Sequence, residues 1–187
     1  MNIIICPGIH EIELTQSFVR SLFNPHTERG DQQLLNILVF PGEGIFTLSA
    51  LHILLFLRDR LNNKLESPVI FIGFSAGVVG AIAAATTWQL QGGNVKALIA
   101  IDGWGVPLSG NFPIHRLSHD YFTHWSSAIL GIGEDNFYAD PPVDHLSMWR
   151  SPHKIQGNWT DPSTRFSHPQ KSLNAADFLH ILLKSYE

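Results

Sequence analysis

The chain has 187 residues, of which 44% are hydrophobic and 15% are charged, so it is long and apolar enough for one domain with a sizeable buried core. The formal net charge is −4 and no cluster of Lys or Arg occurs, which argues against a nucleic-acid partner. We find neither a secretory signal pattern nor an apolar run long enough to span a bilayer, and therefore expect a cytoplasmic protein.

The first half of the chain alternates short apolar runs with segments of helical periodicity. The predicted strands are 3–6, 36–40, 69–72 and 96–101, and the predicted helices are 14–23, 48–65 and 76–91. These strands are uniformly apolar, as expected when helices cover both faces of a parallel sheet. Repeated strand–helix units therefore predict a single α/β domain over residues 1–187, a three-layer α/β/α arrangement with a mostly parallel sheet of about six strands.

The second half of the chain is less regular and is rich in Trp, His and Pro. Strands are expected at 113–117 and 136–139, followed by a closing helix at 172–186. Asn174 is the candidate cap of this helix, and leucines at helical spacing give it an apolar face.

The most informative motif is Gly73-Phe74-Ser75-Ala76-Gly77, which follows the predicted strand 69–72 and opens the predicted helix 76–91. A serine on so tight a turn needs small neighbours, and glycine two positions away on either side removes the clash. The hydroxyl then stands at the carboxyl end of the sheet, above a helix N-terminus that favours a developing anion. This pattern predicts Ser75 as a nucleophile on a strand–turn–helix elbow.

A serine nucleophile requires a histidine base, and the base requires a carboxylate that fixes its tautomer. Among ten histidines we favour His145, which follows the last predicted strand and precedes the closing helix. Asp120 and Asp102 both follow predicted strands and compete as the acid. We prefer Asp120, because it lies one strand later and therefore nearer to His145, with Asp102 as the alternative.

Two further features complete the expected site. The backbone N–H groups of Ile9, in the loop Pro7-Gly8-Ile9-His10, and of Ala76 are the candidate oxyanion donors. Four aromatic residues on predicted loops are candidates for lining an acyl-binding pocket, although core packing is the more common role of any single one of them: Trp104, Phe112, Phe122 and Trp125.

Taken together, these motifs resemble the α/β-hydrolase family, and the short chain without room for a cap domain is similar to its small lidless esterases and lipases. The order Ser75, Asp120, His145 matches the family order of nucleophile, acid and histidine. The resemblance implies a serine hydrolase that cleaves an acyl ester or thioester through an acyl-enzyme, without a cofactor. The first loop, Pro-Gly-Ile-His, and the long segment 149–169 depart from the family pattern.

Other readings remain open. The same triad would serve an acyltransferase, and the fold alone would equally serve a non-catalytic scaffold that binds a ligand or a protein. A metal site at His115, His119 and His124 is a weaker possibility, because the segment does not begin like a helix and contains no Glu. We expect no metal, a small-molecule acyl substrate, and either a monomer or a homodimer.

Overall fold

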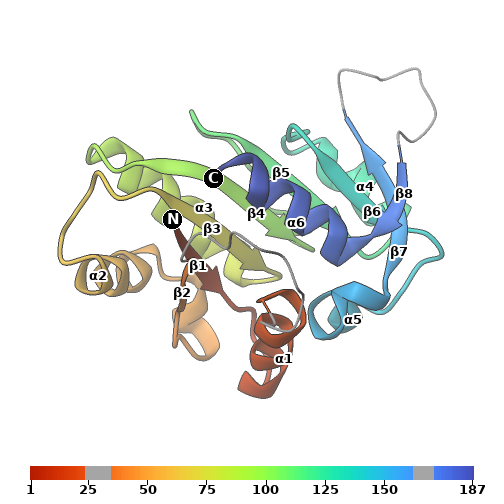
Figure 1. The fold of residues 1–187 in the computed structure, drawn as a ribbon, viewed down its shortest axis with the longest axis horizontal. Helices are drawn as coiled ribbons and strands as arrows, with labels where there is room; N and C mark the ends of the chain where they lie inside the picture. The colour runs from red at the N-terminus through yellow and green to blue at the C-terminus, as the bar shows by residue number, and fades with distance from the viewer. Residues whose placement is uncertain (24–34, 162–170) are drawn as a thin grey trace.

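The computed structural model describes residues 1–23, 35–161 and 171–187. Its strands form one sheet in the order β2-β1-β3-β4-β5-β6-β7-β8 (Figure 1). The strands are β1 (Asn2–Cys6), β2 (Asn36–Val39), β3 (Val69–Phe74), β4 (Val95–Ile101), β5 (Ile114–Ser118), β6 (Asn136–Ala139), β7 (Gln156–Thr160) and β8 (Lys171–Asn174). The α-helices are α1 (Ile12–Phe23), α2 (Ala50–Arg60), α3 (Gly77–Leu90), α4 (Tyr121–Ala128), α5 (His145–Arg150) and α6 (Ala175–Ser185).

The α/β class and the mostly parallel sheet are confirmed, but the expected count of about six strands is wrong. Strands β1 to β6 pair in parallel, and β7 and β8 extend the sheet as antiparallel strands at its edge. Strand β7 reads Gln-Gly-Asn-Trp-Thr and is largely polar, so it lacks the apolar run on which the sequence prediction relied. A strand whose residues are partly exposed does not need such a run.

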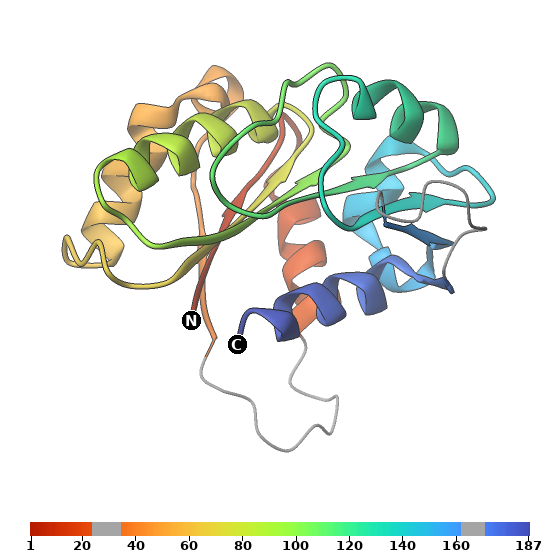
Figure 2. The same ribbon diagram turned by 90° about the horizontal axis from the view of Figure 1, so that it is seen from above.

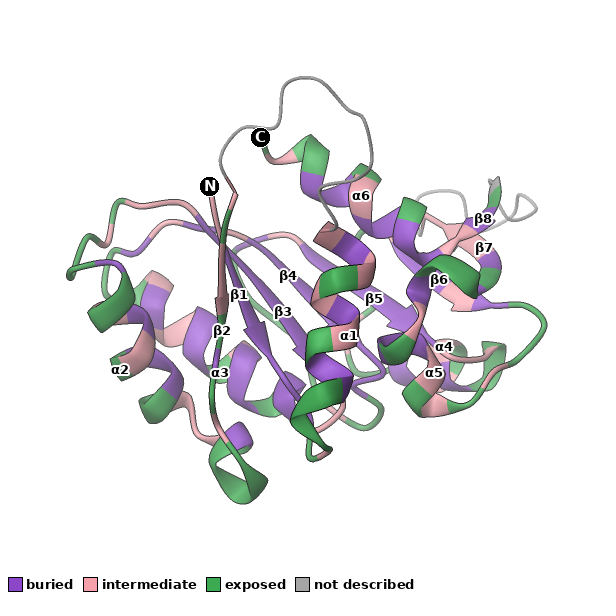
Figure 3. Cartoon of the chain, turned by 60° about the horizontal axis from the view of Figure 1, so that its bottom comes forward, coloured by how far each residue is buried: buried purple, intermediate pink, exposed green. Residues whose placement is uncertain are grey.

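Helices cover both faces of the sheet (Figure 2). Helices α1, α5 and α6 pack over one face, where Phe18, Trp149 and Phe178 are fully buried. Helices α2 and α3 pack over the other face, and the buried residues there include Trp88 of α3 and Phe71 of β3. The inner strands β1, β3 and β4 are buried almost throughout, whereas β2 has a partly exposed face (Figure 3). The three-layer arrangement therefore buries the parallel strands that lead to the carboxyl edge.

Three differences from the predicted helices have local causes. Helix α2 ends at Arg60 and not at residue 65, because Asn62 and Asn63 adopt positive φ angles of 51° and 58°. Helix α4 was not predicted, and neither was α5, since both are short and carry few apolar residues at helical spacing. The closing helix begins after β8, and Asn174 caps it by accepting a hydrogen bond from the Asp177 backbone N–H.

Candidate functional site

Ser75 occupies the turn between β3 and α3. Its φ angle is 51°, in the left-handed region that non-glycine residues rarely adopt, and its backbone N–H donates to the Ile101 carbonyl at 2.9 Å. A Cβ on Gly77 would collide with the carbonyl oxygens of Cys6 and Pro7. The glycine is therefore required, because α3 begins in direct contact with the end of β1, and the strained turn persists because its surroundings fix it.

The loop after β1 lies against this turn. A Cβ on Gly8 would lie 3.1 Å from Ser75 Cβ and 3.0 Å from the Phe74 carbonyl oxygen. The predicted oxyanion donors, the backbone N–H groups of Ile9 and Ala76, donate to no other residue in the described part of the chain. Ala76 follows Ser75 in the turn, and Ile9 follows Gly8, whose backbone lies against Ser75.

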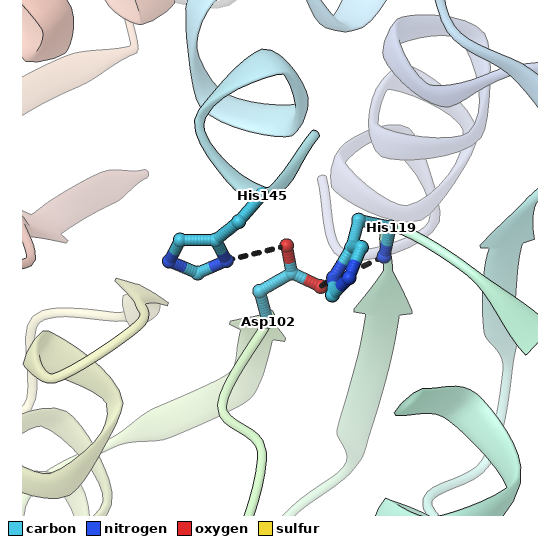
Figure 4. A group of neighbouring side chains, drawn as sticks. All are labelled: Asp102, His119 and His145. Carbon is cyan, nitrogen blue, oxygen red and sulfur yellow. Dashed lines mark hydrogen bonds and ion pairs between the residues drawn. The ribbon is translucent and has the colours of Figure 1, made fainter. Parts of the chain in front are cut away.

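His145 is the first residue of α5, and its imidazole reaches the residue that follows β4. Nδ1 of His145 and Oδ2 of Asp102 are 2.9 Å apart, and the Asp102 side chain is 1% exposed (Figure 4). Asp102 has a φ angle of 52°, and its backbone N–H donates to the Leu117 carbonyl at 2.8 Å. This second left-handed turn holds a buried carboxylate at the carboxyl edge, on the strand next to that of Ser75.

The preferred acid, Asp120, is not the partner of His145. Its Oδ1 accepts a hydrogen bond of 2.7 Å from the Thr123 backbone N–H, so that Asp120 caps the N-terminus of α4. The alternative, Asp102, holds the position instead. Because α4 was not predicted from the sequence, the role of Asp120 as its cap was not predicted either. The available signal was an Asp directly before the segment Tyr-Phe-Thr-His-Trp, at the position of a helix N-cap.

The His145 ring, whose Nδ1 pairs with Asp102, also stacks on aromatic side chains. The imidazole stacks on Phe74 with ring centroids 4.8 Å apart and an interplanar angle of 18°. Phe74 in turn stacks on Trp149 at 4.8 Å, and Trp149 stacks on Phe18 of α1 at 3.7 Å. Because Phe74 immediately precedes Ser75, this run of rings ties His145 to the strand that carries the predicted nucleophile.

The site contains one residue that the sequence prediction did not assign to it. His119, directly after β5, donates its backbone N–H to Oδ1 of Asp102 at 2.8 Å, and its Nδ1 lies 3.1 Å from the same oxygen. Asp102 therefore lies between two imidazoles (Figure 4). The hydrogen bond to Asp102 raises the pKa of His119, partial burial opposes this, and the charges of Asp102, Asp120 and Asp144 add to the increase.

The Ser75 hydroxyl makes no hydrogen bond to His145 or to any other residue within the described ranges. Catalytic hydrogen bonds are often long in the absence of substrate and tighten in the substrate complex. The structure thus brings together the Asp102–His145 pair, whereas the Ser75 hydroxyl, on the turn after the neighbouring strand β3, has no hydrogen-bond partner among the described residues.

The predicted alternative metal ligands do not form a group. His115 is buried in β5, where its Nε2 lies 2.7 Å from the Tyr186 hydroxyl, and His124 in α4 packs against Tyr138. Burial lowers the pKa of both imidazoles. In the described part of the chain, the only set of side chains close enough to share an ion is Asp102, His119 and His145, whose candidate ligand atoms lie within 4.8 Å of one another. The Nδ1 atoms of both histidines are already paired with the carboxylate.

The predicted pocket-lining aromatics divide into two kinds. Trp104, Phe122 and Trp125 are exposed. Phe122 and Trp125 belong to α4, and the Trp104 indole N–H donates to the Ser126 hydroxyl of the same helix at 3.1 Å. Phe112 differs from these three, because it is 7% exposed and belongs to a buried hydrophobic cluster that includes residues of α3. Its neighbours there are apolar, so its side chain serves packing.

A cavity lies elsewhere along the same edge. It has a volume of about 880 Å³ and opens between the first loop, α1 and the end of β2. Ile9, Ile12, Val39 and Phe40 line it, and Gly8, whose backbone abuts Ser75, forms part of its wall. Sequence patterns do not predict this cavity, because it forms where the first loop, α1 and the end of β2 meet.

Searches against models of known protein families and against curated proteins find no match to this chain. In the described residues, none of the helices has both the length and the apolar character needed to cross a membrane. The case for a function therefore rests on the geometry of the site.

Proposed function

We propose that the protein is a serine hydrolase of the α/β-hydrolase type that cleaves an acyl ester or thioester through an acyl-enzyme. The observation that carries the proposal is the 2.9 Å pair between His145 Nδ1 and Asp102 Oδ2, set at the strand edge where Ser75 occupies a left-handed turn. In this proposal Ser75 is the nucleophile, His145 is the base and Asp102 replaces Asp120 as the acid.

The proton steps follow from the pairing. Asp102 is an acceptor when ionised, so His145 carries its proton on Nδ1 and leaves Nε2 free to accept the Ser75 hydroxyl proton. Ser75 Oγ then attacks the acyl carbon, and the resulting oxyanion receives hydrogen bonds from the backbone N–H groups of Ile9 and Ala76. The imidazolium returns the proton to the leaving group, and a water molecule, activated by the same base, releases the acid.

The cavity supports an apolar acyl group as the substrate. Its lining combines Ile9, Ile12 and Val39, and its wall at Gly8 belongs to the loop that would bind the oxyanion. A volume of about 880 Å³ lies within the range of pockets that enclose small organic ligands. We therefore place the acyl chain in this cavity, and not against the exposed aromatic rings beside α4.

The test is a series of p-nitrophenyl esters of increasing acyl length. Each buried methylene contributes about 0.8 kcal/mol, so kcat/KM should rise about fourfold per carbon until the cavity is filled. Ile12→Asp should abolish this dependence on length and leave the acetate ester unaffected. Leu90→Asp, at the exposed far end of α3, is the matched control and should behave as the unaltered protein.

One observation favours a second candidate, a non-catalytic scaffold that binds an apolar ligand. The Ser75 hydroxyl lacks a hydrogen bond to the described residues around it, whereas a scaffold would need the cavity alone. The ester series separates the two. A scaffold would bind the longer acids and release no p-nitrophenol above the rate of a Ser75→Ala variant.

A further inference from the structure

The Asp102 carboxylate has more partners than a serine hydrolase requires. Oδ2 pairs with His145 alone, while Oδ1 accepts both the backbone N–H and the imidazole Nδ1–H of His119, at 2.8 and 3.1 Å. The carboxylate is almost fully buried, with a side chain that is 1% exposed. His119 itself is fixed at its other backbone group, since its carbonyl accepts from the Val143 N–H at 3.0 Å.

We propose that His119 is a positioning residue that fixes the orientation of Asp102 toward His145 and, through its own positive charge, extends catalysis to lower pH. The inference rests on the proposed serine hydrolase function. It assigns His119 no contact with the substrate. Two donors on Oδ1 leave the carboxylate a single orientation, in which Oδ2 faces His145.

The surroundings of His119 favour its charged form. Three carboxylates lie near it: Asp102 in direct contact, Asp120 with an oxygen 3.9 Å from Nε2, and Asp144 further away. The one other ionisable ring against it is His145, with ring centroids 5.9 Å apart in an edge-on arrangement, as judged over the described residues. The hydrogen bond to Asp102 is the main reason that the pKa of His119 is raised, with the negative charges adding to it.

The charge has a defined consequence for the base. A positive charge on His119 opposes a second positive charge on His145, so it favours the neutral imidazole that accepts the Ser75 proton. Protonated His119 should therefore move the acidic limit of the reaction downward.

The first experiment measures the rate at which a fluorophosphonate probe modifies Ser75 as a function of pH. His119→Asn keeps a donor near the position of Nδ1 and removes the titratable charge. We expect its acidic midpoint to lie above that of the unaltered protein, with the same rate at high pH. His153→Asn, which alters an exposed histidine that pairs with Ser21, should leave the midpoint unchanged. Superimposed profiles of the His119→Asn variant and the unaltered protein would overturn the proposal.

The second experiment needs no catalytic activity. The His119 ring proton is followed by NMR across pH in the unaltered protein and in Asp102→Asn. We expect a titration midpoint above the ordinary value of about 6.5, which returns toward it in the variant. A midpoint that is not raised, or that does not respond to Asp102→Asn, would overturn the pairing. If Ser75 does not react with the probe at all, the proposed function fails, and the NMR result still decides whether His119 is coupled to Asp102.

Discussion

The sharpest prediction concerns the choice of acid, because two aspartates compete and the structure gives them different environments. In Asp102→Asn, the His119 backbone N–H can only donate, so it selects the amide oxygen at the position of Oδ1. The amide NH₂ group then faces His145 Nδ1. That nitrogen must become an acceptor, which places the imidazole proton on Nε2 and leaves no base for Ser75.

The wrong tautomer should be very costly. In a serine triad the same exchange lowers kcat by about 10⁴, which corresponds to about 5 kcal/mol of transition-state stabilisation. We expect a loss of 10³ to 10⁴ (about 4–5 kcal/mol) in kcat for Asp102→Asn with a p-nitrophenyl ester, at unchanged secondary structure by circular dichroism.

Asp120→Asn is the matched control. Asp120 accepts from the Thr123 N–H at 2.7 Å as a helix cap, and Asn caps helices about as well as Asp. Activity should therefore stay within about threefold of the unaltered protein, since the cap is retained. The reasoning is refuted if Asp102→Asn keeps more than a tenth of the activity, or if Asp120→Asn loses as much as Asp102→Asn does.

Four further predictions test packing and ionisation. Arg116 is 3% exposed and donates to the carbonyls of Gly131, Val106 and Leu130. Arg116→Met should therefore lower the free energy of unfolding, measured in urea, by about 3–5 kcal/mol. The control Arg150→Met, at an exposed residue, should change it by less than about 0.5 kcal/mol. Gly77→Ala should prevent folding or shift α3, seen as lost thermal cooperativity, because its Cβ would overlap the Pro7 carbonyl. Burial lowers the pKa of His115, so the folded state binds fewer protons than the unfolded chain. The free energy of unfolding should therefore fall as the pH drops below about 6.5, by up to about 1.4 kcal/mol per pH unit. His115→Gln should remove that contribution from urea unfolding curves measured across pH. Burial also raises the pKa of the Cys6 thiol, which should react with a disulfide reagent only after denaturant is added; rapid reaction of the native protein would contradict its burial.

The parallel part of the fold could be predicted because its strands are continuous apolar runs. Runs such as 69–72 are buried on both faces, and this burial is recorded directly in the sequence. The antiparallel edge could not be predicted in the same way, because β7 is polar and obtains its strand conformation from pairing with β6 and β8. Its partners are set by tertiary structure rather than by its own residues.

The site shows the same division. The strand–turn–helix at Ser75 could be predicted because its turn imposes a local pattern of glycines, and the place of His145 in the chain because it follows the last parallel strand. The partner of His145 could not be chosen with confidence from sequence, since Asp102 and Asp120 both follow strands and only the unpredicted helix α4 occupies Asp120. The contact between His119 and Asp102 could not be predicted for a related reason. It exists because β5 pairs next to β4, so that the residues following the two strands lie side by side.

The central claim is that Ser75 is an activated nucleophile, and labelling with a fluorophosphonate probe tests it most directly. The folded protein is treated with the probe at a pH where a histidine base is neutral, and the modified peptide is identified by mass spectrometry, with Ser75→Ala as the control. We expect one equivalent of probe on Ser75 and none on the variant. Absence of labelling in the folded protein, or labelling that persists in Ser75→Ala, would contradict it.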